Sequence, residues 1–117
     1  MSKDLRTAIE IYERIAEEID KEDYGNAHLD IMNALFFVDR INPGSEQYGY
    51  TIGARVVGFI AYMRGLSEKL DKAFACSLAK KKVDDSIKHG IEYFKQGIDE
   101  SVPFIRFHLD GLEEKVT

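Results

Sequence analysis

The chain has 117 residues, of which 44% are hydrophobic and 32% charged, and its formal net charge at pH 7 is −5. This size predicts one domain, residues 1–117, with enough apolar material for a single core. The negative charge disfavours nucleic acid and an anionic membrane surface as partners, because both attract a basic face.

Residues 3–20 form the first predicted element, an amphipathic helix. Ser2 is the candidate cap, and Asp4 in the first turn suits the positive end of the helix dipole. The apolar positions recur with the three- and four-residue spacing of a helix, which predicts the side that enters the core. These positions are Leu5, Ile9, Tyr12, Ala16 and Ile19.

Residues 24–41 predict a second helix, with Asp23 as its cap. The segment Asn42-Pro43-Gly44 ends this helix, because proline disfavours helical geometry in the residue before it and glycine accepts turn angles. A short turn between two helices makes them antiparallel neighbours. The positions expected to face the core are Ala27, Ile31, Ala34, Leu35, Val38 and Ile41.

The stretch 46–66 is the predicted centre of the fold, a helix that is apolar on nearly all sides and therefore buried. Ser45 is its expected cap. Two neighbouring stripes recur along it, one of large side chains that fill space and one of small side chains that let a second backbone come close. The large stripe is Ile52, Val56, Phe59, Met63 and Leu66, and the small stripe is Thr51, Ala54, Gly58, Ala61 and Gly65.

Two other interpretations of the same stretch are weaker. A membrane span needs about 20 apolar residues, and the uninterrupted run 56–63 between Arg55 and Arg64 is too short. Valine, isoleucine and tyrosine also favour strands. The three- and four-residue spacing, together with the turn that precedes residue 46, favours the helix.

The end of the central helix has two interpretations. The stripe of large residues continues in register to Ser77, which would give one long helix. Alternatively, Gly65 ends the helix and Ser67 caps a separate one over residues 67–82. We prefer the break near Gly65, because glycine inside a helix costs roughly 1 kcal/mol relative to alanine.

Residues 85–100 and 102–115 predict the last two helices. They are separated near Pro103, because proline is tolerated in a first turn but kinks a helix interior. Ser101 is the candidate cap of the final helix. The whole pattern predicts an all-α fold, an antiparallel bundle of four to six helices around the buried helix 46–66.

The residue spacing offers little catalytic or metal-binding chemistry. None of His28, His89 and His108 has glutamate or histidine at the spacing of HExxH or ExxH sites, and no nucleophile motif occurs. Cys76 is the only cysteine, so neither an internal disulfide nor a multi-thiolate metal site is available. We therefore predict no catalytic residue, no metal and no cofactor.

The candidate partner-binding residues lie on or next to the central helix. Tyr48, Arg55 and Tyr62 are spaced by seven residues, and tyrosine and arginine are side chains that anchor interfaces. One interpretation makes them a contact strip for a protein partner, and the other pairs Arg55 with a carboxylate of the first or second helix. Gly58 and Ala61 belong to the small stripe, which would support a symmetric homodimer if it is left uncovered.

These features lead to three functional hypotheses. The first is a non-enzymatic interaction protein (an adaptor, regulator or subunit) that self-associates, in the cytoplasm because the N-terminus lacks the apolar core of a signal peptide. The second is a bundle that encloses a small apolar ligand. The third is a small hydrolase or nuclease that acts through His89 or His108. The ligand pocket of the second hypothesis would be lined by Phe36, Phe37, Phe59, Met63 and Phe94.

Overall fold

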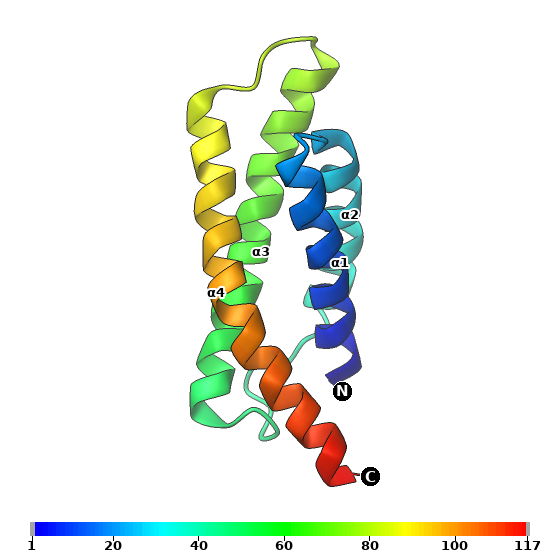
Figure 1. Cartoon of the computed structure of the whole chain (residues 1–117), viewed down its shortest axis with the longest axis vertical. Helices are drawn as coiled ribbons and strands as arrows, with labels where there is room; N and C mark the ends of the chain where they lie inside the picture. The colour runs from blue at the N-terminus through cyan, green and yellow to red at the C-terminus, as the bar shows by residue number, and fades with distance from the viewer. Residues whose placement is uncertain (1, 117) are drawn as a thin grey trace.

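The computed structural model describes residues 2–116, with side chains described for residues 3–112. The helices of the described chain are α1 (Ser2–Asp20), α2 (Tyr24–Val38), α3 (Gly49–Leu78) and α4 (Asp85–Val116). Consecutive helices run in opposite directions and pack in a bundle that measures 51 × 21 × 21 Å (Figure 1). The predicted all-α antiparallel bundle is confirmed, and its helix number is the lowest of the expected range.

The α1–α2 hairpin is closed by hydrogen bonds at its turn. The N–H of Asp23 donates to the carbonyl of Glu18 at 2.8 Å, and Glu22 takes a left-handed φ of 55°. Asp23 then caps α2, as predicted, because its side chain accepts from the N–H of Asn26. The second helix ends at Val38 rather than at Ile41, since the chain enters a hydrogen-bonded turn there.

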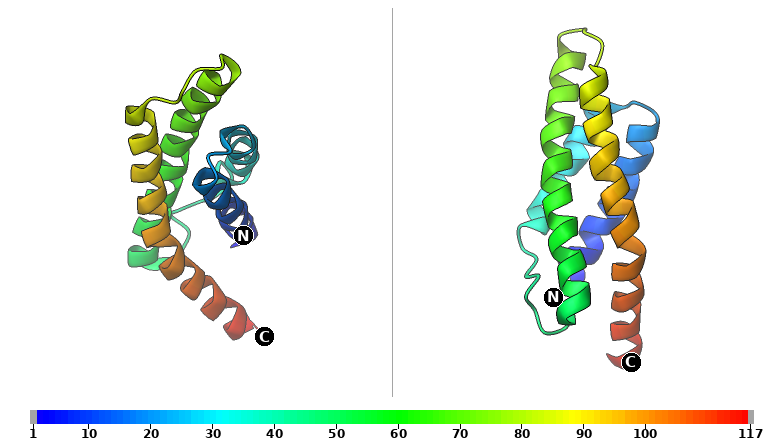
Figure 2. Two further views of the ribbon diagram at one scale, coloured as in Figure 1. Left: turned by 45° about the horizontal axis from the view of Figure 1, so that its top comes forward. Right: turned by 90° about the vertical axis from the view of Figure 1, so that its left-hand side faces the viewer.

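The core lies between the inner sides of the four helices. The predicted apolar sides of α1 and α2 enter it, with Leu5, Ile15 and Ile31 fully buried. Each buried side chain of this size stabilises the fold by roughly 1.5–3 kcal/mol relative to exposure. The bundle is therefore held by apolar packing both within and between two hairpins, one of α1 and α2 and one of α3 and α4. Figure 2 shows how the two hairpins are arranged.

The third helix is continuous, so the predicted break near Gly65 and the separate helix over 67–82 are wrong. A Cβ at Gly65 would lie 2.5 Å from the ring of Phe94 in α4. Glycine is needed here for the close approach of an aromatic ring, and the helix continues without interruption to Leu78. The burial of Leu66 and Leu70 on both sides of this region explains why the helix persists.

The start of α3 also differs from the prediction. Ser45 is not the cap, because the helix begins at Gly49 after Tyr48, whose side chain makes no capping hydrogen bond. Ser45 instead belongs to a turn in which its N–H donates to the carbonyl of Asn42 at 3.1 Å. The segment 39–48 is thus a longer connection than the sequence suggests.

The fourth helix passes through Pro103 without interruption, so the predicted separation into helices 85–100 and 102–115 is wrong. Proline removes one backbone hydrogen bond and bends a helix, but it does not unfold the turns around it. Val102 and Ile105 on either side are buried in the core and hold the helix there. Figure 2 shows the change of direction in the orange part of α4.

The burial of α3 is one-sided. Its predicted stripe of large side chains packs inward, with Val56, Phe59 and Met63 fully buried. The opposite side is open, because Ala54 and Ala61 are exposed. The helix is therefore the central contributor to the core, and its outer side remains available.

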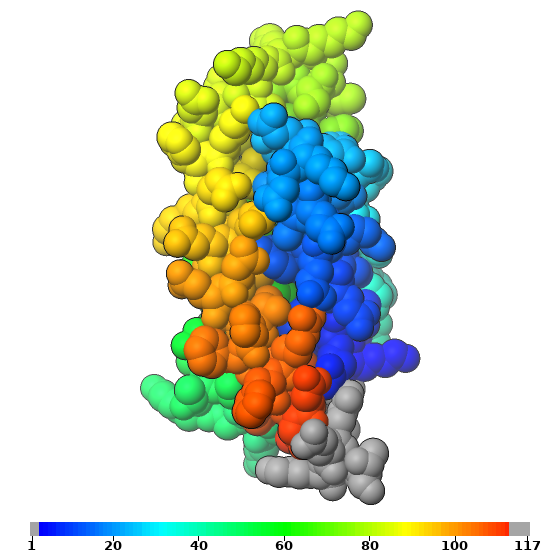
Figure 3. Space-filling view, viewed as in Figure 1, coloured from blue at the N-terminus to red at the C-terminus, as the bar shows by residue number. Residues whose placement is uncertain are grey.

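Side chains of α1 and α4 meet along the opposite face of the bundle and close the gap between the two ribbons (Figure 3). Arg6 of α1 makes an ion pair there with Asp110 of α4 at 2.9 Å, and Arg106 of α4 makes one with Glu13 of α1 at 2.7 Å. Among the helices of the described residues, none combines the length and the apolar character needed to cross a membrane.

Candidate interaction face

The seam between α3 and α4 is built by side chains that repeat every seven residues. The Tyr62 ring packs on Gly97, where an added Cβ would lie 2.6 Å from the ring. The Lys69 side chain packs in the same way on Gly90. Further along the seam, the Arg55 guanidinium lies 4.0 Å from the centre of the Phe104 ring. This regular alternation keeps the two antiparallel helices in one register, as ridges packed into grooves do.

Two glycines and two aromatic rings interlock across this seam. Phe94 of α4 occupies the space above Gly65 of α3, and Tyr62 of α3 occupies the space above Gly97 of α4. The two rings and Tyr93 form a cluster, with centroid distances of 6.0 Å for Tyr62–Phe94 and 5.2 Å for Tyr93–Phe94. The predicted site residue Tyr62 is therefore half-buried, and it holds the two helices together.

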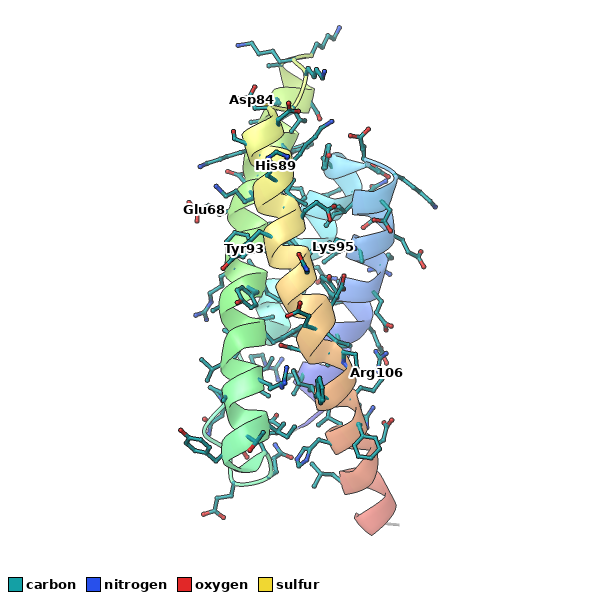
Figure 4. All side chains as sticks on the ribbon, turned by 60° about the vertical axis from the view of Figure 1, so that its left-hand side comes forward. Glu68, Asp84, His89, Tyr93, Lys95 and Arg106 are labelled. Atoms are coloured by element: carbon teal, nitrogen blue, oxygen red, sulfur yellow. The ribbon has the colours of Figure 1, made fainter. Side chains whose placement is uncertain are left out.

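The outer sides of α3 and α4 form one continuous surface, which we call the α3–α4 face. Gly58 lies on it, with nothing within 4 Å of the position that its Cβ would take. Ala54 and Ala61 flank Gly58 and are exposed. Figure 4 looks onto this face, where Tyr93 lies on the open side of α4 while Lys95 and Arg106 point towards α1.

Aromatic side chains extend the same face beyond the bend of α4. Phe104 is 54% exposed and Phe107 is 83% exposed, and both border a shallow groove of about 320 Å³. The rest of the lining is formed by Ile52, His108, Gly111 and Leu112. Aromatic rings that stay this exposed in the single chain mark a surface suited to protein contact.

Arg55 lies at the inner edge of this face. Its guanidinium stacks on Phe104 of α4, and no carboxylate of α1 or α2 is placed beside it. Within residues 3–112, no ion pair involves Arg55. A cation over an aromatic face is attracted by about 0.5–2 kcal/mol, and the charge of Arg55 remains available for a carboxylate from outside the chain.

Tyr48 is placed away from the other predicted partner-binding residues. Its side chain is only 3% exposed, and its ring centroid lies 6.4 Å from that of His108. Burial, followed by the charge of Asp4, raises the pKa of the Tyr48 hydroxyl. The structure thus brings Arg55, Gly58, Ala61 and Tyr62 to one part of the α3–α4 seam, and it leaves Tyr48 in the packing beneath.

The five residues expected to line a ligand pocket occupy different environments. Phe59 and Met63 are fully buried in the core, and Phe36 is 59% exposed on the outside of α2. Phe94 is held on Gly65 at the seam. These side chains do not line one common space, because they belong to the core, the outer surface and the α3–α4 seam.

The histidines lie far apart on the bundle. His89 is exposed on α4, and Nε2 of His108 lies 2.6 Å from the carbonyl oxygen of Gln47. His28 stacks on Phe74, and its Nε2 lies 3.2 Å from Asp71 Oδ1. Among the residues that the structure describes, no three histidine, cysteine, aspartate or glutamate side chains gather closely enough to hold a metal ion.

Sequence reasoning missed a polar cluster between α1 and α4. The hydroxyl of Tyr12 donates to Asp99 Oδ1 at 2.6 Å, and Lys95 Nζ lies 3.3 Å from Asp99 Oδ2. Burial, followed by the hydrogen bond to Asp99 and the nearby carboxylates, raises the pKa of Tyr12. The hydrogen bonds of this cluster join α1 to α4.

The comparisons with known proteins return no relative. No family model matches the chain, and no match is found among the curated proteins or the solved structures. The function is therefore argued from the α3–α4 face alone.

Proposed function

We propose that the chain is a non-enzymatic protein-interaction module, an adaptor, regulator or subunit, that self-associates through the α3–α4 face. A cytoplasmic location belongs to this proposal. The observation that carries it is the combination, on one face, of small residues that allow close approach with two exposed aromatic rings. Ala54, Gly58 and Ala61 supply the small residues, and Phe104 and Phe107 supply the rings.

The dimensions of the face agree with this proposal. A side of the bundle measures 51 × 21 Å, which is about 1,000 Å². A standard interface removes about 800 Å² of surface from each partner. Two copies that share most of this side would thus bury enough area for a stable homodimer, with the small residues where the helices cross.

Light scattering coupled to gel filtration tests the proposal directly. We expect the wild-type chain to be a dimer at high micromolar concentration and Ala61→Glu to be a monomer with unchanged helix content by circular dichroism. The introduced carboxylate would be buried without a partner in the dimer, while it would stay in water on the monomer.

Asn33→Glu is the control, because it places the same carboxylate at an exposed position of α2, outside the α3–α4 face. We expect this variant to remain dimeric. A wild-type chain that stays strictly monomeric would contradict the proposal. A dimer that Ala61→Glu leaves intact would place the interface elsewhere on the molecule.

A further inference from the structure

Among residues 3–112, two opposite charges on the α3–α4 face have no ion pair. Arg55 stacks on Phe104 without a carboxylate, and Glu100 is exposed on α4 one turn before Phe104. Across residues 3–112, no ion pair includes Glu100, whereas most neighbouring charges of α4 are paired, for example Lys95 with Asp99 and Arg106 with Glu13. Arg55 and Glu100 are thus two opposite charges of this face that have no ion pair among the described residues.

The seam register places these charges at the level of the small residues. Tyr62 lies on Gly97 and Arg55 lies on Phe104, so the part of α3 between residues 55 and 62 runs beside residues 97–104 of α4. Gly58 falls within this part of α3, and Glu100 falls within the adjoining part of α4. The charges and the open glycine thus belong to one small area.

On the basis of the proposed self-association, we propose that two copies meet around a twofold axis that passes between Glu100 and Phe104. Glu100 of each copy then forms an ion pair with Arg55 of the other copy, on either side of the axis. The same contact buries Phe104 and Phe107, which are 54% and 83% exposed in the single chain.

Charge self-complementarity identifies a second copy as the occupant. In a twofold contact, every group on one copy meets a group of the same face on the other. Arg55 and Glu100 lie at the same level of the seam, so a twofold contact at that level can join each guanidinium to the carboxylate of the other copy. The bend of α4 near Pro103 is located at the same level of the seam (Figure 2).

A charge-reversal experiment tests the pairing between copies. Arg55→Glu alone would place two carboxylates at each contact, and Glu100→Arg alone would place two guanidinium groups there. We expect each variant by itself to raise the dimer dissociation constant at least tenfold. An equimolar mixture of the two variants should form a heterodimer, because both contacts then join opposite charges again.

Native mass spectrometry measures the result, since the two variants differ in mass and a heterodimer is resolved from both homodimers. Lys21→Glu and Glu17→Arg are the controls, because they reverse exposed charges on and next to α1. We expect both control variants to dimerise like the wild type. Each variant carries like charges at positions 55 and 100 of its own chain. Recovery of the dimer on mixing would therefore show that the ion pair forms between two chains and not within one.

The outcomes separate this inference from the proposed function. A dimeric wild type whose two variants remain monomeric when mixed would overturn the Arg55–Glu100 pairing and leave self-association in place. Single variants that dimerise as tightly as the wild type would overturn the pairing in the same way. A wild-type chain that is monomeric would overturn the proposed self-association together with this inference.

Discussion

The glycines of α3 have different surroundings, and this difference determines the effect of a methyl group at each. A Cβ at Gly65 would lie 2.5 Å from the Phe94 ring, whereas a Cβ at Gly58 would have no neighbour within 4 Å. In both positions alanine favours the helix by roughly 1 kcal/mol over glycine. Only at Gly65 does the packing oppose this gain.

Gly58→Ala is expected to raise the free energy of unfolding by about 0.5–1 kcal/mol. Gly65→Ala is expected to lower it by about 1–3 kcal/mol, because Phe94 must leave its place in the seam. Urea titrations at one low protein concentration compare the two variants with the wild type. A Gly65→Ala chain as stable as the wild type would contradict the packing of Phe94 on this glycine.

The carboxylate of Glu18 is a residue-scale source of pH dependence. Its Oε1 atom is buried without a hydrogen-bond partner. Burial, followed by Asp30 and Asp23, raises the pKa of Glu18 to about 7, while Arg14 opposes the shift. This pKa lies above the ordinary glutamate value of 4.5, so the folded chain binds the proton more tightly than the unfolded chain does. The resulting stabilisation is fully present below pH 4.5 and is lost as the pH rises through about 7.

We therefore expect Glu18→Gln to be more stable than the wild type at about pH 8. The variant should also lose part of the decline in stability that the wild type shows between about pH 5 and 8. Thermal unfolding across this pH range measures both effects. Glu17→Gln, an exposed neighbour on the same helix, is the control and should retain the wild-type pH profile.

At the scale of the elements, α3 ends in a conformation that suits glycine. Lys80 takes a φ of 57°, and the N–H of Lys81 donates to the carbonyl of Cys76 at 2.8 Å, which closes the helix end. A left-handed backbone costs a residue with a side chain roughly 1–2 kcal/mol. Glycine is the residue that this position of a helix end favours.

Lys80→Gly is expected to stabilise the chain by about 1 kcal/mol, measured by urea titration. Glu22 at the end of α1 has a similar φ of 55°, but its carboxylate lies 2.8 Å from Lys88 Nζ. Glu22→Gly should accordingly gain less, because it also removes this ion pair. An equal gain in both variants would show that the ion pair contributes nothing measurable.

At the scale of the whole molecule, self-association would link stability to protein concentration. A partner that binds only the folded chain stabilises it by mass action. For a homodimer, each tenfold increase in concentration adds about 1.4 kcal/mol per mole of dimer. The midpoint of thermal unfolding should then rise by a few degrees per tenfold increase.

Differential scanning calorimetry at about 10 and 300 µM would detect this rise in the wild type. The Ala61→Glu variant should show a midpoint that does not change with concentration. A wild-type midpoint that is equally constant would contradict the dimer independently of gel filtration.

Much of the fold could be predicted because it depends on local patterns. The three- and four-residue spacing of apolar side chains located α1, α2 and the buried side of α3, and the capping chemistry located Asp23. The same local reasoning placed helix ends at Gly65 and Pro103, where glycine and proline are unfavourable in an isolated helix. The candidate face was only partly predictable, because Gly58 and Ala61 stand out by size, whereas the partners of Arg55 and Tyr62 lie on α4.

The sequence by itself determined the class of fold, the inward sides of the helices and the turn between α1 and α2, since these depend on residues a few positions apart. Only the tertiary structure decided that Gly65 receives Phe94, that Tyr48 is buried and that the outer side of α3 stays open. The physical reason is that these features arise from contacts between helices far apart in the chain, where packing outweighs the local preference of a single residue.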